Sequence, residues 1–231
     1  MTHTAVVLLH GALGASDQFE ALAALLADSF EVHRLEFEGH GARPAADRPF
    51  RMEHFAANVV TYLDEQGLDS AHLFGYSLGG FVACLVGLAQ PARAQRIVTL
   101  ATKFHWDPTV AAREAGFLDV EKMRAKVPHF AQSLAARHTG AGWETVVNQT
   151  RAMLLALGES GGFTPTQAAG LTQPVRVMLG DRDRTVTLAE TVAIYQALPQ
   201  GQLEILPDTP HPLEKVSPKR LALALSDFFA A

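Results

Sequence analysis

One serine of this chain stands among glycines, in the stretch FGYSLGG at residues 74–80. Its centre, GYSLG, matches the pattern G-x-S-x-G between a β-like run and a helical run, the context that this motif requires. A strand that turns directly into a helix brings positions 75 and 79 together, where only glycine fits. We therefore interpret Ser77 as a nucleophile that a strained backbone presents at a helix N-terminus. An incidental serine in a glycine-rich turn is the alternative.

A serine hydroxyl is a weak nucleophile, so Ser77 needs a base and an acid that orients the base. Two later apolar runs, VRVML and LEIL, end in loops that carry Asp183 and His211. In a parallel sheet these loops lie at the same edge as Ser77. The chain order Ser, Asp, His is also one in which catalytic triads occur. Asp181 and Asp208 are the alternative acids.

The chain holds ten histidines, and His211 is preferred as the base because of its position. His10 lies in the turn after the first apolar run and is expected to be structural, and His40 belongs to the GHG loop and is expected to brace it. Three others lie in or near a helical segment, where surface or pocket-lining positions are expected: His105, His129 and His138.

The elements that must position these residues alternate along most of the chain. Apolar runs typical of buried strands occur at residues 5–9, 30–37, 71–74, 96–101, 175–179 and 203–206. Helical patterns occur at residues 53–66, 78–90 and 188–197 and from 217 onward. Asp17 with Glu20 is typical of a capping box at the start of a further helix. This order predicts an α/β fold, with a doubly wound, mostly parallel sheet of about six strands and helices on both faces.

The alternation breaks after the fourth strand, where the chain shows helical patterns and no convincing strand. We predict a core of residues 1–106 and 171–231, with an all-helical cap of residues 107–170 inserted within this single domain. Because the insertion leaves the carboxyl end of a strand, the cap should lie over Ser77.

Composition limits the classes of function. The 231 residues are 48% apolar and 19% charged, which suits a single globular domain. A net charge of −5 without a basic stripe favours a small-molecule substrate over nucleic acid. The one cysteine, Cys84, cannot form an internal disulfide, and no apolar run reaches membrane-spanning length, so we expect a cytoplasmic protein without a membrane partner. No metal-ligand spacing, dinucleotide fingerprint or P-loop occurs, so neither a metal nor a cofactor is expected.

In combination, these motifs resemble the α/β-hydrolase superfamily, in its compact form with a helical cap, over nearly the whole chain. The resemblance is carried by HGALG after the first strand, EGHGARP after the second, GYSLGG, GDRD and TPHPLEKV. It implies that Ser77 is the nucleophile, His211 the general base and Asp183 the acid that orients His211. It also implies an oxyanion hole formed by the backbone N–H groups of Ala12 and Leu78.

The function that the resemblance implies is hydrolysis of a small carboxylic ester through an acyl-serine intermediate, without a cofactor. Thioesterase, lactonase, carbon–carbon hydrolase, perhydrolase and lyase chemistry remain open, as does a ligand receptor with weak catalysis on the same fold. Four residues are predicted to line the substrate pocket: Lys103, Phe104, Trp106 and Trp143. Lys103 is the candidate contact for a polar or anionic group.

Overall fold

The structure, a computed structural model, describes residues 3–230. Within them lies one parallel sheet of six strands in the order β2-β1-β3-β4-β5-β6. The strands are β1 (Ala5–Leu9), β2 (Glu31–Leu35), β3 (Ala71–Tyr76), β4 (Ala94–Leu100), β5 (Val175–Gly180) and β6 (Gly201–Leu206). The predicted fold class is confirmed, and every predicted strand is present within a few residues of its expected bounds.

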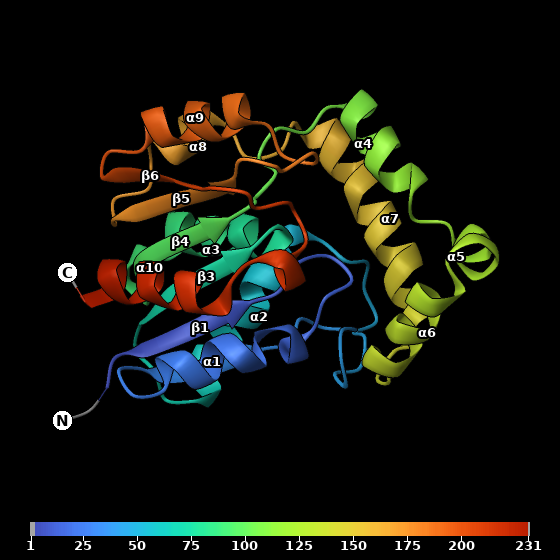
Figure 1. Cartoon of the computed structure of the whole chain (residues 1–231), viewed down its shortest axis with the longest axis horizontal. Helices are drawn as coiled ribbons and strands as arrows, with labels where there is room; N and C mark the ends of the chain where they lie inside the picture. Colours follow the sequence, from blue (N-terminus) through green and yellow to red (C-terminus); the bar gives the residue numbers. More distant parts are fainter. Residues whose placement is uncertain (1–2, 231) are drawn as a thin grey trace.

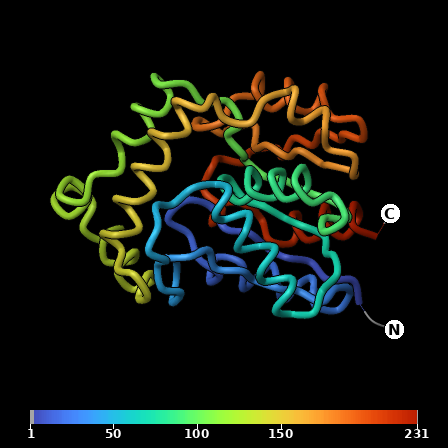
Figure 2. The backbone as a smooth tube through the Cα atoms, turned by 180° about the vertical axis from the view of Figure 1, so that it is seen from behind, coloured from blue at the N-terminus to red at the C-terminus, as the bar shows by residue number. Residues whose placement is uncertain are grey.

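Helices cover both faces of the sheet, and two apolar layers form as a result (Figures 1 and 2). The helices on one face are α1 (Glu20–Leu26) and α10 (Pro218–Ala230); those on the other are α2 (Met52–Glu65), α3 (Leu78–Ala89) and α9 (Leu188–Ala197). Successive strand residues point to opposite faces, so Val6 and Leu8 of β1 belong to the α1 and α10 layer. Val7 and Leu9 belong to the α2 and α3 layer. The continuous apolar character of β1 follows from this double burial.

The start of α1 differs from the prediction. A 3-10 helix, η1 (Ser16–Phe19), precedes α1, and neither N-terminus has a side-chain cap. The predicted capping box at Asp17 and Glu20 is therefore wrong. The carboxylate of Asp17 pairs instead with Arg137, with 3.2 Å between Oδ2 and Nε, so a contact from a distant part of the chain replaces the local cap.

Five helices and no strand are described between β4 and β5, all within the range predicted for the cap: α4 (Pro108–Gly116), α5 (Val120–Lys126), α6 (Pro128–Arg137), α7 (Trp143–Ser160) and α8 (Pro165–Ala168). Asp107 begins α4 as its N-cap, because its side chain accepts the N–H of Val110 at 2.7 Å. Gly161, with φ of +84°, ends α7. In Figure 1, α4 to α7 form an arm beside the sheet, whereas α8 lies against α9.

The carboxyl ends of the strands lie on the side of the sheet that faces this arm. β1 pairs with β2 on one side and with β3 on the other, so the chain reverses its direction of winding at β1. Loops that leave the carboxyl ends of strands at such a reversal part from each other and leave room for a ligand. The loops after β1 and β3 are the ones that carry Ala12 and Ser77. No helix in residues 3–230 is both long enough and apolar enough to cross a bilayer.

Candidate active site

Ser77 occupies a strained turn between β3 and α3, with φ of 51° and ψ of −117°. A Cβ atom at Gly75 would collide with the backbone of Gly79, which is the steric reason predicted for that glycine. A Cβ atom at Gly79 would collide with the backbone of Leu9 in β1 instead. The N–H of Ser77 donates to the carbonyl of Leu100 at 2.8 Å and thereby ties the turn to β4. The turn holds the Ser77 hydroxyl in one place.

Ser77, His211 and Asp183 form one chain of contacts, as the sequence predicted for their positions. The Nδ1 atom of His211 donates to Oδ2 of Asp183 at 2.7 Å. This bond leaves Nε2 of His211 as an acceptor, and Nε2 lies 3.4 Å from Oγ of Ser77. The second distance is longer than an ordinary hydrogen bond, as is common for such pairs without a bound substrate. In this arrangement, Nε2 of His211 can take the proton of the Ser77 hydroxyl.

Asp183 is held from several sides. Its side chain is 1% exposed, and its Oδ1 atom accepts the backbone N–H groups of Thr185 at 2.7 Å and Val186 at 2.9 Å. Burial alone would raise the pKa of Asp183, but the hydrogen bonds from His211, Val186 and Thr185 outweigh burial and lower it below its ordinary value. Asp183 is therefore an ionised carboxylate that can fix the orientation of His211.

The two alternative acids lie elsewhere. Oδ1 of Asp181 accepts the backbone N–H of Thr209 at 3.1 Å, so Asp181 connects two loops. The side chain of Asp208 is 96% exposed and faces Arg182, with 3.8 Å between Oδ1 and Nε. Of the three aspartates considered, only Asp183 contacts His211.

Tyr76 supports the base and was not identified from the sequence. Its hydroxyl donates to the backbone carbonyl of His211 at 3.0 Å, and the two rings lie side by side with centroids 5.7 Å apart. Burial raises the pKa of Tyr76, so its hydroxyl stays a donor. The only sequence signal for this role is its place beside Ser77, since its partner is 135 residues away.

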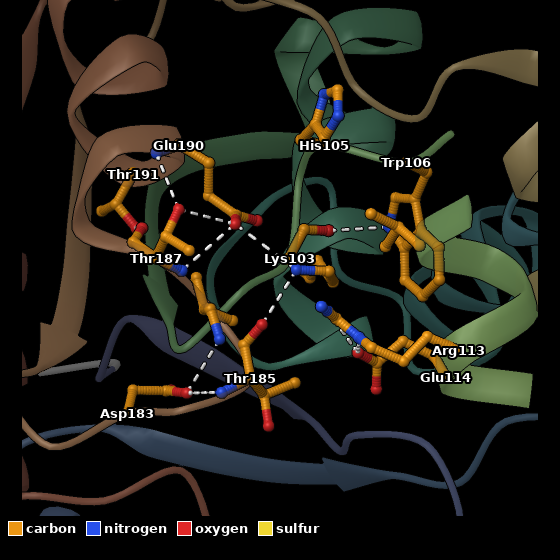
Figure 3. A network of polar contacts seen from close by, with 12 residues as sticks. Lys103, His105, Trp106, Arg113, Glu114, Asp183, Thr185, Thr187, Glu190 and Thr191 are labelled. Carbon is orange, nitrogen blue, oxygen red and sulfur yellow. Dashed lines mark hydrogen bonds and ion pairs between the residues drawn. The ribbon is translucent and has the colours of Figure 1, made fainter. Parts of the chain in front are cut away.

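Lys103 connects the end of β4 to the loop that carries Asp183 (Figure 3). Its Nζ atom donates to the carbonyl of Thr185 at 2.8 Å and lies 3.4 Å from Oε2 of Glu190. The side chains of Lys103 and Glu190 are 8% and 10% exposed. The same oxygen of Glu190 accepts the N–H and O–H groups of Thr187 in the capping box of α9. Lys103 therefore braces the loop that carries Asp183.

Two backbone donors lie beside Ser77 at the positions predicted for an oxyanion hole. The loop after β1 packs closely there, because a Cβ atom at Gly11 would lie 3.2 Å from Cβ of Ser77. The N–H of Ala12 donates to no protein atom within the part of the chain that the structure describes. Leu78 is the first residue of α3, where a helix provides no acceptor for the N–H group. Both residues line the same cavity as Ser77.

That cavity has a volume of about 280 Å³, which is near the lower limit for small-molecule sites. It lies between the strand ends and the cap, and most of its lining side chains are apolar. Lys103 and Trp106 line it, as predicted. The other lining residues are Ala12, Leu13, Met52, Tyr76, Ser77, Leu78, Phe81, Glu114, Phe117, Leu118, Leu154, Thr185 and His211.

Phe104 and Trp143 do not line this cavity, which corrects the prediction for these two residues. Phe104 contacts Phe163, with ring centroids 5.9 Å apart, and faces a second cavity on the α9 side of Lys103. Trp143 lies under Arg124, whose guanidinium carbon is 5.5 Å from the ring centroid, in a shallow hollow of the cap. Both are buried packing residues: Trp143 begins α7, and Phe104 lies in the connection between β4 and α4.

Two further groups bear on cofactor chemistry. Among residues 3–230, no group of three or more His, Cys, Asp or Glu side chains could hold a metal ion. Cys84 is buried within α3, and burial raises the pKa of its thiol to about 12. The thiol therefore stays protonated and lies outside the cavity that contains Ser77.

Comparison with known proteins agrees with this fold. A profile of the alpha/beta hydrolase fold family matches residues 4–156, and the chain belongs to that family. The chain is 33% identical over 98 residues to the pimeloyl-[acyl-carrier protein] methyl ester esterase of Aeromonas hydrophila, covering 42% of this chain and 37% of the relative. It is 27% identical over 123 residues to the dihydrolipoyllysine-residue acetyltransferase component of the acetoin cleaving system of Cupriavidus necator, covering 53% and 33%.

The fold as a whole is similar to that of solved enzymes. The enol-lactonase of Burkholderia xenovorans LB400 superposes with a TM-score of 0.81 at 20% identity, covering 100% of this chain and 93% of the other. Identity at this level shows the fold alone. The chain spans only about a third of the length of the two curated relatives above. The comparisons thus show the family and the fold of this chain.

Proposed function

We propose that this protein hydrolyses a small carboxylic ester through an acyl-Ser77 intermediate. The observation that carries the proposal is the connected chain from Asp183 through His211 to Ser77 on the floor of a mostly apolar cavity. The matched esterase of Aeromonas hydrophila supports ester chemistry, because its name describes hydrolysis of a methyl ester.

In the acylation step, Nε2 of His211 takes the proton of the Ser77 hydroxyl as Oγ attacks the ester carbonyl carbon. Asp183 stays ionised and stabilises the imidazolium that forms. The imidazolium then gives its proton to the alkoxide that leaves, and the acyl group remains on Ser77. Water, activated by His211, attacks the acyl carbon and releases the carboxylic acid.

The negative charge of each tetrahedral intermediate would fall beside the N–H groups of Ala12 and Leu78. Each such donor contributes about 3 kcal/mol to transition-state stabilisation by analogy with a donor deletion measured in another hydrolase. Leu78 also begins α3, whose N-terminal dipole favours negative charge at that position.

The size and lining of the cavity support a small substrate. A volume of about 280 Å³ accommodates only a modest acyl group, and apolar residues of the cap form its upper wall. We also propose a reducing compartment such as the cytoplasm, because the one cysteine, Cys84, cannot form an internal disulfide. The net charge of −5 is consistent with a small-molecule substrate rather than nucleic acid or a membrane.

The test is a comparison of wild type and Ser77→Ala on p-nitrophenyl esters of graded acyl length, with a thioester and a lactone of matched size. We expect turnover of short-chain esters by wild type and loss of that turnover in Ser77→Ala. Turnover of the thioester or the lactone alone would replace the ester in this proposal. Absence of turnover on all three classes by a folded wild type would favour the ligand receptor.

A further inference from the structure

The cap reaches the loop that carries Ala12 through two neighbouring residues, Arg137 and His138, and His138 makes the shorter contact. His138 follows α6 and is 1% exposed, and it does not line the substrate cavity. The expected surface or pocket-lining position is therefore wrong for His138. Its Nδ1 atom accepts the backbone N–H of Gly41 at 3.0 Å, and its Nε2 atom donates to the carbonyl of Leu13 at 3.0 Å. This pair of bonds requires the neutral ring with its proton on Nε2. Burial lowers the pKa of His138, which favours that form.

Neighbours of His138 fix the same junction. The N–H of Gly140 donates to the carbonyl of Gly41 at 3.0 Å, and a Cβ atom at Gly140 would lie 2.6 Å from the carbonyl oxygen of Ala42. Arg137 pairs with Asp17, and its Nη1 atom lies 3.4 Å from the carbonyl oxygen of Leu13. In Figure 1, α6 lies at the end of the cap nearest β1 and α1. The end of α6 is therefore docked tightly on the loops after β1 and β2.

The contact at Leu13 continues to the proposed oxyanion hole through two peptide groups. The carbonyl that His138 holds shares its peptide plane with the N–H of Gly14. That N–H donates to the carbonyl of Gly11 at 3.1 Å, and the carbonyl of Gly11 shares its plane with the N–H of Ala12. Peptide groups are rigid, so the orientation of the first plane constrains the second.

The backbone at Leu13 needs such support. Its φ of 57° is left-handed, which is costly for a residue with a branched side chain. His10 supplies a second restraint, because its Nδ1 atom donates to the carbonyl of Gly11 at 2.9 Å. The loop is thus held from the core side by His10 and from the cap side by His138.

We propose that His138 is a positioning residue for the oxyanion hole, holding the N–H of Ala12 in place from the cap through the Leu13–Gly14 and Gly11–Ala12 peptide groups. This inference rests on the proposed function of Ser77. Its consequence is that the hole is complete only while the end of α6 is seated on the core. Loss of the His138 contact therefore weakens transition-state stabilisation more than it weakens substrate binding.

Three substitutions at His138 and one matched control test the proposal. His138→Phe keeps the ring volume and removes both hydrogen bonds. His138→Gln keeps an acceptor and a donor at a spacing close to that of the two ring nitrogens, and His138→Asn carries the same pair on a shorter stem. His129→Phe makes the same change on an exposed position of α6 that does not contact the loop.

The readouts are kcat and KM on a p-nitrophenyl ester and the second-order rate constant for labelling of Ser77 by a fluorophosphonate. We expect His138→Phe to lower kcat and the labelling rate by about 10- to 100-fold while KM changes by less than about threefold. His138→Gln should recover most of both rates, and His129→Phe should match wild type. The labelling rate needs no natural substrate, so it tests the position of Ala12 even if the wild type fails to hydrolyse esters.

Wild-type kcat and labelling rate in a folded His138→Phe variant would overturn the proposal. Equal losses in His138→Phe and His138→Gln would also overturn it, because they would show that restoring a donor and an acceptor at this position has no effect on either rate. If His138→Phe does not fold, the order of the two amide variants decides. A higher labelling rate in His138→Gln than in His138→Asn at similar melting temperatures supports the proposal, and equal rates contradict it.

Discussion

The Nδ1 atom of His211 lies 2.7 Å from Oδ2 of Asp183, while the other ring nitrogen lies 3.4 Å from the hydroxyl oxygen of Ser77. The tight contact is on the side of the buried acid and the loose contact on the side of the solvent-accessible hydroxyl. This asymmetry fixes the tautomer of His211 before a substrate is bound. It also leaves Nε2 able to move toward Ser77 during proton transfer.

Asp183→Asn should remove the charge that selects this tautomer and leave the surrounding loop in place, because Oδ1 can still accept two backbone N–H groups. We expect kcat to fall by about 10⁴-fold, by analogy with the same change in a serine protease triad. Circular dichroism and the melting temperature should stay close to wild type. A loss of less than tenfold would show that Asp183 is not the orienting acid.

Lys103→Met should destabilise the protein, because it leaves the nearly buried carboxylate of Glu190 without its partner. Loss of one partner of a buried ion pair costs about 3 to 5 kcal/mol. Urea unfolding should show this loss, and the double variant Lys103→Met/Glu190→Gln should recover part of it.

The same variant separates bracing from substrate recognition. If Lys103 braces the Asp183 loop, kcat should fall alike for esters with neutral and anionic acyl groups. A loss of kcat/KM for the anionic substrate alone would instead show that Lys103 contacts the substrate, as predicted from the sequence.

Much of this site could be predicted because its signals are local. The turn at Ser77 follows from glycines within two residues, and the positions of Asp183 and His211 follow from loops at the ends of parallel strands. The family resemblance added the two residues proposed for the oxyanion hole, Ala12 and Leu78. These predictions depend on chain order and backbone sterics rather than on the packing of distant side chains.

The incorrect predictions depend on tertiary contacts. Phe104 and Trp143 follow an apolar pattern, but the pattern does not say which partner an apolar side chain meets, and both pack within the protein. Asp17 does not cap a helix, because its carboxylate pairs with Arg137, which is 120 residues away in the chain. The supporting role of Tyr76 depends in the same way on a distant carbonyl.

Stability should depend on pH through buried histidines. Burial, aided by the charge of Arg96, lowers the pKa of His72 from 6.5 to about 4. The unfolded chain therefore binds a proton at His72 near pH 6.5, whereas the folded protein does so only near pH 4. The contribution of neutral His72 to the free energy of unfolding is therefore fully present above pH 6.5 and is lost as the pH falls from 6.5 toward 4.

The control for this effect is a substitution that removes one titrating group. His72 stacks on Phe229 with ring centroids 4.6 Å apart, so His72→Phe should fit the same space. We expect the melting temperature of His72→Phe to fall less steeply than that of wild type between pH 6.5 and 4. His129→Phe, at an exposed position, should follow the wild-type curve, and identical curves for all three proteins would contradict the assignment.

Acyl-chain preference should depend on the cavity wall contributed by α7. Leu154 lines the cavity, whereas the neighbouring Leu155 is 39% exposed and does not line it. Leu154→Ala should shift the preferred p-nitrophenyl ester toward longer acyl chains, at a cost of about 2 to 5 kcal/mol in stability. Leu155→Ala should leave the chain-length profile unchanged, and the same profile in both variants would place the acyl group elsewhere.

The central claim is that catalysis passes through an ester of Ser77, and peptide mass mapping after a rapid acid quench of the reaction with a p-nitrophenyl ester tests it most directly. We predict an acyl adduct on the peptide that contains Ser77, with neither adduct nor turnover in Ser77→Ala. Turnover that persists in a folded Ser77→Ala variant, or an adduct on any other residue, would contradict the claim.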